Sequence, residues 1–169
     1  MEKVVINRIT GTDKWIKGLS ELLIKVVEDG ASIGFLPPLS FSEAKAYWKD
    51  VGDDDTFLFI ATINDMVVGS VQLQLSSKPN GRHRAEIAKL MTHPDFRRKG
   101  IGRSLMEVAE EMALQEKRSL LVLDTREGDP SNFLYSSLGY IQAGRIPDYA
   151  ISSSGNFDAT IFYYKTLDK

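Results

Sequence analysis

A short basic stretch with two glycines precedes the longest predicted helix and has the chemistry of an anion site. Three consecutive cations, Arg97, Arg98 and Lys99, are followed by Gly100 and Gly102. The first N–H groups of a helix lack intrahelical partners and lie at the positive end of the helix dipole. Glycines allow a ligand to approach the backbone, where a Cβ would collide. The stretch therefore predicts a site for phosphate or pyrophosphate.

Two familiar phosphate motifs fit this stretch poorly. The spacing does not match the G-x-x-x-x-G-K-S/T pattern of a nucleotide P-loop. A dinucleotide fingerprint needs a third glycine where Leu105 stands, although Asp124 lies about 20 residues further on, as a ribose-binding acid would. The stretch also follows a predicted hairpin rather than opening a βαβ unit. A nicotinamide enzyme is therefore a rival interpretation with little support.

The elements that must position this site alternate between strand and helix patterns. Apolar periodicity predicts helices that begin near Thr12-Asp13 and Ser42, at Gly100 (or, for its regular part, near Arg103) and at Asp129-Pro130. Strands are predicted over Val4–Ile9, Thr56–Ile63, Val67–Leu75, Ala85–Thr92, Leu120–Asp124, Tyr140–Arg145 and Thr160–Tyr164. The order β-α-α-β-β-β-α-β-α-β-β predicts one mixed α/β domain over residues 1–169.

Composition excludes several classes of function. The 169 residues carry a formal net charge of −2, so a general nucleic-acid role has no support and the basic stretch indicates one anionic ligand. The absence of cysteine excludes disulfides, thiolate nucleophiles and Cys-ligated zinc, and with two histidines no metal is expected. No apolar run reaches the ~20 residues of a membrane span, and Met1-Glu2-Lys3 shows no signal-peptide pattern. We therefore expect a cytoplasmic protein without a membrane partner.

Two motifs together resemble the GNAT superfamily of acyl-CoA-dependent N-acyltransferases. Residues Arg97–Gly102 match its Q/R-x-x-G-x-G/A motif, and His93–Phe96 is similar to the usual approach to that motif. Residues Leu134–Tyr140 resemble the second signature, with a tyrosine, a Leu-Gly pair and a further aromatic residue. The order of elements from Val4 to Lys165 also resembles that of the family. The resemblance implies a single GNAT-like mixed-sheet domain with acetyl-CoA as co-substrate.

Three further segments resemble a subgroup that includes the tabtoxin-resistance acetyltransferase. They are Phe35–Pro38, Ala85–Leu90 and Gly128-Asp129. This resemblance implies acetylation of a primary amine of a small molecule. A catalytically silent acyl-CoA-binding sensor or partner domain is the alternative. Dimers are common in the family, so a homodimer is compatible with the sequence.

The resemblance also assigns roles to individual residues. Tyr135 matches the tyrosine that protonates the departing thiolate, and Glu86 matches a carboxylate that takes the amine proton. Asp124, or a chain of waters, is an alternative base, and Asp124 could instead anchor a cationic substrate. Many members have an asparagine where Gly128 stands, and Asn132 is the candidate to replace it. The implied cofactor-binding residues are Leu90, Met91, Thr92, Arg97, Arg98, Lys99, Gly100, Ile101, Gly102, Arg103, Ser104 and Asn132.

Overall fold

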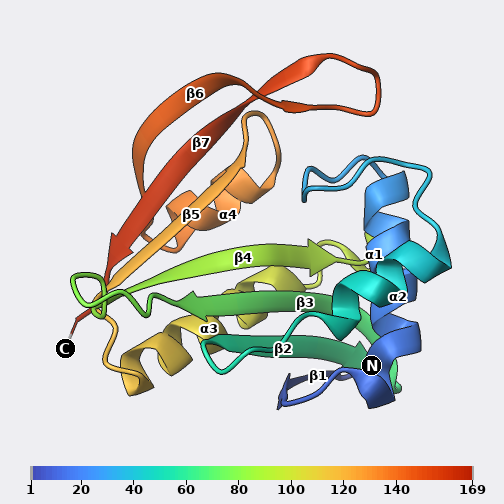
Figure 1. Ribbon diagram of the computed structural model, residues 1–169, viewed down its shortest axis with the longest axis horizontal. Coiled ribbons are helices and arrows are strands. Elements are labelled where there is room, and N and C mark those ends of the chain that lie inside the picture. Colours follow the sequence, from blue (N-terminus) through green and yellow to red (C-terminus); the bar gives the residue numbers. More distant parts are fainter. Residues whose placement is uncertain (1, 169) are drawn as a thin grey trace.

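One seven-stranded sheet organises the molecule, with strand order β1-β2-β3-β4-β5-β7-β6 (Figure 1). The computed structural model describes residues 2–168. The strands are β1 (Val4–Ile9), β2 (Thr56–Ile63), β3 (Met66–Leu75), β4 (Arg84–Thr92), β5 (Leu120–Arg126), β6 (Ile141–Ile151) and β7 (Phe157–Thr166). The helices are α1 (Ile16–Glu28), α2 (Phe41–Lys49), α3 (Ile101–Gln115) and α4 (Ser131–Ser137), with short 3-10 turns at Asp13–Trp15 and Pro94–Phe96. All neighbouring strands are antiparallel except β4 and β5, which are parallel.

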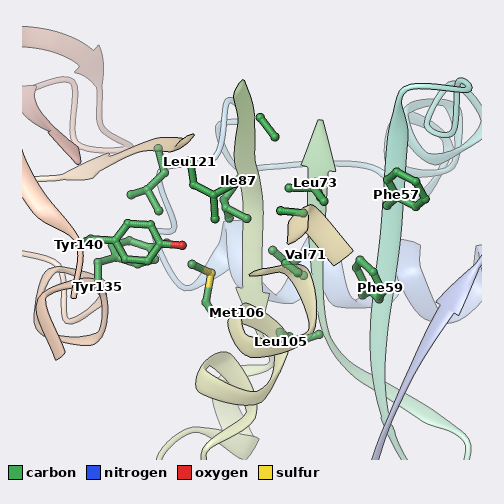
Figure 2. Packing of buried hydrophobic residues seen from close by; sticks show 14 of the residues in the cluster. Phe57, Phe59, Val71, Leu73, Ile87, Leu105, Met106, Leu121, Tyr135 and Tyr140 are labelled. Carbon is green, nitrogen blue, oxygen red and sulfur yellow. The ribbon is translucent and has the colours of Figure 1, made fainter. Parts of the chain in front are cut away.

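Apolar residues on alternating positions of the strands build a core on each face of the sheet. On one face, Leu105 and Met106 of α3 pack with Tyr135 of α4 and with side chains of β2 to β5 (Figure 2). On the other face, α1 and α2 cover β2 and β3, and Trp48 is fully buried there. Each large apolar side chain that is fully buried contributes about 1.5–3 kcal/mol relative to exposure. The two cores fix the helices on opposite faces of one sheet.

The parallel strands β4 and β5 pair only at their beginnings. Their register joins Arg84 to Leu120, Ala85 to Leu121 and Glu86 to Val122, and no pair follows. Figure 1 shows the two strands starting side by side and then diverging. We call this divergence beyond Glu86 and Val122 the fork. Along the fork, the edge of β4 that faces β5 has no strand partner among the described residues.

The first turn of α3 lies close to the sheet because β3 carries a glycine there. A Cβ on Gly69 would lie 2.9 Å from Cγ2 of Ile101 and 3.0 Å from the carbonyl oxygen of Met91. Any side chain at this position would therefore push the helix away from the ends of β3 and β4. The glycine thus fixes where α3 begins relative to β4.

The predicted order of elements is confirmed, with changes at several boundaries. Helix α3 begins at Ile101, two residues before Arg103. Strands β6 and β7 extend to Ile151 and Phe157, so their hairpin is longer than predicted and ends with the pairs Ala150–Asp158 and Ile151–Phe157. A bulge between Ile146 and Ala150 accommodates Pro147, which an edge strand tolerates because its N–H is not needed for pairing. Among residues 2–168, no helix is long and apolar enough to cross a membrane.

Candidate active site

The predicted anion site is a tight turn that links the 3-10 turn after β4 to the start of α3. Arg98 has φ +62° and Gly100 has φ +76°, so two left-handed residues flank Lys99. The first intrahelical bond of α3 runs from the N–H of Ser104 to the carbonyl of Gly100. The N–H groups of Ile101–Arg103 therefore have no partner within the helix. These donors, at the positive end of a 15-residue helix, suit a diphosphate.

The basic side chains around this turn have different surroundings. Arg97 forms a 2.6 Å ion pair with Asp29 just after α1, so its side chain is directed toward that helix. Arg103 donates to Oγ of Ser137 at 2.7 Å and thereby links the first turn of α3 to the end of α4. Arg98 and Lys99 are exposed and form no ion pair among residues 2–168. Their charges are therefore the ones most available to a bound anion.

The edge of β4 next to this turn is free to pair with an extended ligand. A bulge shifts the register with β3 between Ser70 and Gln72, and Lys89 within the bulge has φ +54°. Of the three predicted residues, Leu90 lies in the bulge and Met91 and Thr92 follow it, along the unpaired side of the fork. An amide-containing arm can pair with such an edge as an added strand would. The arm would then run directly toward the N–H groups at the start of α3.

Tyr135 lies on α4 with its ring in the core and its hydroxyl without a hydrogen-bond partner among residues 2–168. Its ring lies beside that of Tyr140 (Figure 2), with the two centroids 5.8 Å apart, and its centroid is 5.9 Å from that of Tyr163. The Tyr140 hydroxyl is fully buried, whereas the Tyr135 hydroxyl is not, and it makes no hydrogen bond to another described residue. Burial, reinforced by the charges of Asp124 and Asp129, raises the pKa of Tyr135 well above its usual range. The phenol is therefore protonated at neutral pH and can donate.

Glu86, Asp124 and Lys89 form a charged group on the opposite face of the sheet. Glu86 pairs in register with Val122, and Asp124 follows Val122 on the same face of β5. Burial raises the pKa of Glu86 and Asp124 raises it further, while Lys89 lowers it. Burial lowers the pKa of Lys89, and the two carboxylates oppose that shift. Asp124 also accepts a 2.8 Å hydrogen bond from Thr160, which holds its carboxylate in place.

Asn132 uses its polar atoms within the protein. Its amide nitrogen donates to the carbonyls of Arg126 and Asp129, both at 2.9 Å, and its oxygen accepts from Tyr163 at 2.7 Å. This side chain therefore fastens α4 to β5 and β7. Gly128, which stands where many members of the resembled family have asparagine, has φ +89° in the turn before α4. That backbone conformation explains the glycine, since other residues are strained there.

The predicted residues thus fall into two groups that meet at the fork. The turn, the edge of β4 and Tyr135 belong to the α3 face, whereas Glu86 and Asp124 belong to the α1 and α2 face. Sequence reasoning missed Lys89, whose Nζ donates to the carbonyl of Ile33 at 2.6 Å. The signal was present: a lysine interrupts the apolar alternation after Ile87, as a bulge does.

Known proteins are similar to this chain both in sequence pattern and in fold. The sequence profile of the acetyltransferase (GNAT) family matches residues 20–140. An acetyltransferase of the GNAT family from Streptococcus pneumoniae is 19% identical, with a TM-score of 0.81 over 98% of this chain and 100% of that chain. A ribosomal-protein-alanine N-acetyltransferase from Brucella melitensis is 21% identical, with a TM-score of 0.80 over 96% and 99% of the two chains. The protein yncA from Salmonella typhimurium, solved with its cofactor acetyl-CoA, is 18% identical, with a TM-score of 0.80 over 98% and 95%.

Proposed function

This chain belongs to the GNAT family of acetyltransferases, and from that premise we propose that it moves an acetyl group from acetyl-CoA directly to a primary amine of a small molecule. One observation carries the proposal: the unpaired edge of β4 leads into the free N–H groups of Ile101–Arg103. An extended arm that ends in a diphosphate is the ligand that fits both features. The similar fold of yncA, which was solved with acetyl-CoA, supports the same ligand. The segments Phe35–Pro38 and Ala85–Leu90 favour a small-molecule acceptor, because they resemble the tabtoxin-resistance subgroup.

In the proposed reaction, residues of this chain handle two protons. The amine nitrogen forms a bond to the thioester carbonyl carbon, and the C–S bond breaks. Glu86, directly or through water, accepts the proton that the amine loses, with Asp124 as the alternative base. Tyr135 donates a proton to the departing thiolate, and its raised pKa keeps that proton in place until then. The N–H groups of the turn and the cations Arg98 and Lys99 bind the diphosphate, while Leu90–Thr92 pair with the arm.

A panel of amines tests this function through the release of free thiol. With acetyl-CoA in excess, at least one primary amine should raise thiol release above the rate of thioester hydrolysis, and mass spectrometry should find the acetylated amine. A protein that binds coenzyme A but releases no thiol with any amine would contradict the proposal.

The assignment of Glu86 as the base predicts a defined pH dependence. Glu86 can accept a proton only when it is ionised. The slope of log kcat/KM against pH should therefore become steeper below the pKa of Glu86 than it is above that pKa. The carboxylate of Asp124 raises the pKa of Glu86. Asp124→Asn should therefore lower that pKa and move the break in the profile to lower pH.

The measurement is the pH profile of kcat/KM for wild type, Asp124→Asn and a matched control. Asp65→Asn makes the same change of charge at an exposed turn between β2 and β3 and should leave the break unmoved. If Asp124→Asn left the break in place, or moved it to higher pH, Glu86 would not be the group that controls it.

A further inference from the structure

A pocket of about 350 Å³ lies between the α1–α2 loop and the β6–β7 hairpin. The same pocket is lined by residues of both segments, and Figure 1 shows the loop facing the hairpin. Its apolar wall includes Phe35, Leu36, Pro37, Tyr149 and Ile151. Pockets of this size hold small ligands rather than folded partners.

The carboxylates of the candidate site lie on the same face of the sheet as Arg126, the residue of β5 that lines this pocket. Arg126 lines the pocket and lies two residues after Asp124 on the same face of β5. Lys89 of β4 lies beside the pocket, since its Nζ donates to the carbonyl of Ile33 and would lie 3.1 Å from a Cβ on Gly34, which lines the pocket. An acceptor in the pocket could therefore extend its amine to the fork.

Arg126 is the only charged side chain among the described residues that line the pocket, and it has unused donors. Its Nε donates to Asp129 at 3.0 Å, and one terminal nitrogen lies 3.7 Å from Asp158, too far for a hydrogen bond. A guanidinium has five N–H donors, and the others make no bond to another described residue. The side chain is 23% exposed, so these donors are largely shielded from bulk water.

The charges around Arg126 favour an uncharged oxygen as its ligand. Asp129 and Asp158 already balance its positive charge. Glu86 and Asp124 bring the carboxylates to four, whereas the cations are two, Arg126 and Lys89. One protonated amine relieves this excess, whereas a ligand carboxylate increases it. A carbonyl or hydroxyl oxygen can use the free N–H groups without adding charge.

We propose, as a deepening of the acetyltransferase function on which it rests, that the acceptor is a small amine with no other charge and with an uncharged oxygen close to the amine. The amine lies at Glu86 and Asp124, the oxygen accepts from Arg126, and the apolar body fills the pocket beside Phe35 and Tyr149. Asp124 and Arg126 are separated by two residues, about 6.6 Å along the strand. The amine and the oxygen are therefore a few bonds apart, as in an α-amino amide.

Three aromatic amines of similar size test this proposal: L-phenylalaninamide, L-phenylalanine and phenethylamine. The readout is kcat/KM for thiol release in wild type and in Arg126→Met. L-phenylalaninamide should exceed L-phenylalanine in wild type by about tenfold or more, because the free acid adds a carboxylate. The ratio of L-phenylalaninamide to phenethylamine should fall about tenfold in Arg126→Met, because the bond to a charged donor is lost. In this second comparison the intrinsic differences between the amines cancel, because the same ratio is measured in wild type and variant.

A second variant keeps the test valid if Arg126→Met folds poorly. Tyr149 is 52% exposed, so Tyr149→Ala should fold normally. It should reduce the preference for L-phenylalaninamide over glycinamide, since only the larger amide has a body that fills the pocket. Phe133→Ala is the matched control, because Phe133 is 81% exposed on α4 and lies outside the pocket. It should leave every ratio unchanged.

The possible outcomes distinguish a failure of the proposed acceptor class from a failure of the proposed acetyltransferase function. Equal or faster use of L-phenylalanine, or substrate ratios that neither Arg126→Met nor Tyr149→Ala changes, would overturn the acceptor class alone, because turnover would still show an acetyltransferase. If no amine of the full panel released thiol from a protein that binds coenzyme A, both the function and the acceptor class would be overturned.

Discussion

Tyr135→Phe is expected to lower kcat by about 10²- to 10⁴-fold, the range for removal of a general acid. Its affinity for coenzyme A should stay within about twofold of wild type, because phenylalanine keeps the ring that packs against Tyr140 and Tyr163. The lost hydroxyl makes no hydrogen bond to another described residue, so its removal should cost little stability. Steady-state thiol release gives kcat, and equilibrium titration gives the affinity.

Tyr140→Phe is the matched control for this variant. Tyr140 is also buried and lies beside Tyr135, but its hydroxyl is enclosed within the core. The control should therefore keep its kcat close to that of wild type. Turnover by Tyr135→Phe within a few-fold of wild type would remove the phenol from the mechanism, as would equal losses in both variants.

Gly102→Val is expected to weaken coenzyme A binding at least about tenfold, which is about 1.4 kcal/mol. Gly102 belongs to the first turn of α3, where a Cβ would lie 3.3 Å from Cδ2 of Leu134 and 3.8 Å from Oγ1 of Thr92. A valine side chain would press against Leu134 and Thr92, and it would block a ligand from reaching the free N–H groups of the helix. Isothermal titration of coenzyme A into the folded variant measures the loss.

A control must distinguish the steric block of coenzyme A from a general effect of placing a β-branched residue in α3. Leu114→Val places a β-branched residue in the last turn of α3, at a side chain that is 44% exposed. It should leave the affinity for coenzyme A unchanged and lower the melting temperature slightly. If Gly102→Val bound coenzyme A within about twofold of wild type, the diphosphate would not lie on this turn.

Local signals made the fold and the position of the turn before α3 predictable. Apolar periodicity decides where each strand and helix forms, and the element order follows from it. The turn before α3 depends on Gly100 and its neighbours in the chain, so its position could be predicted from the sequence. The start of α3 at Ile101 still differed from Arg103, because Gly102 is a poor helix former and hid the first turn.

Contacts between distant segments could not be predicted in the same way. The pair of Arg97 with Asp29 depends on where α1 ends in space. The bonds that occupy Asn132 come from β5 and β7 as well as from its own helix turn. The pocket at Arg126 exists because the β6–β7 hairpin continues past its bulge to meet the α1–α2 loop. Each of these depends on tertiary packing, which the local pattern of residue types does not contain.

A crystal structure of the protein with bound coenzyme A tests the proposed cofactor site most directly. We expect diphosphate oxygens within hydrogen-bond distance of the N–H groups of Ile101–Arg103, the arm along Leu90–Thr92, and the sulfur beside the Tyr135 hydroxyl. A coenzyme A molecule bound elsewhere, with the turn before α3 left empty, would show that this turn is not the diphosphate site.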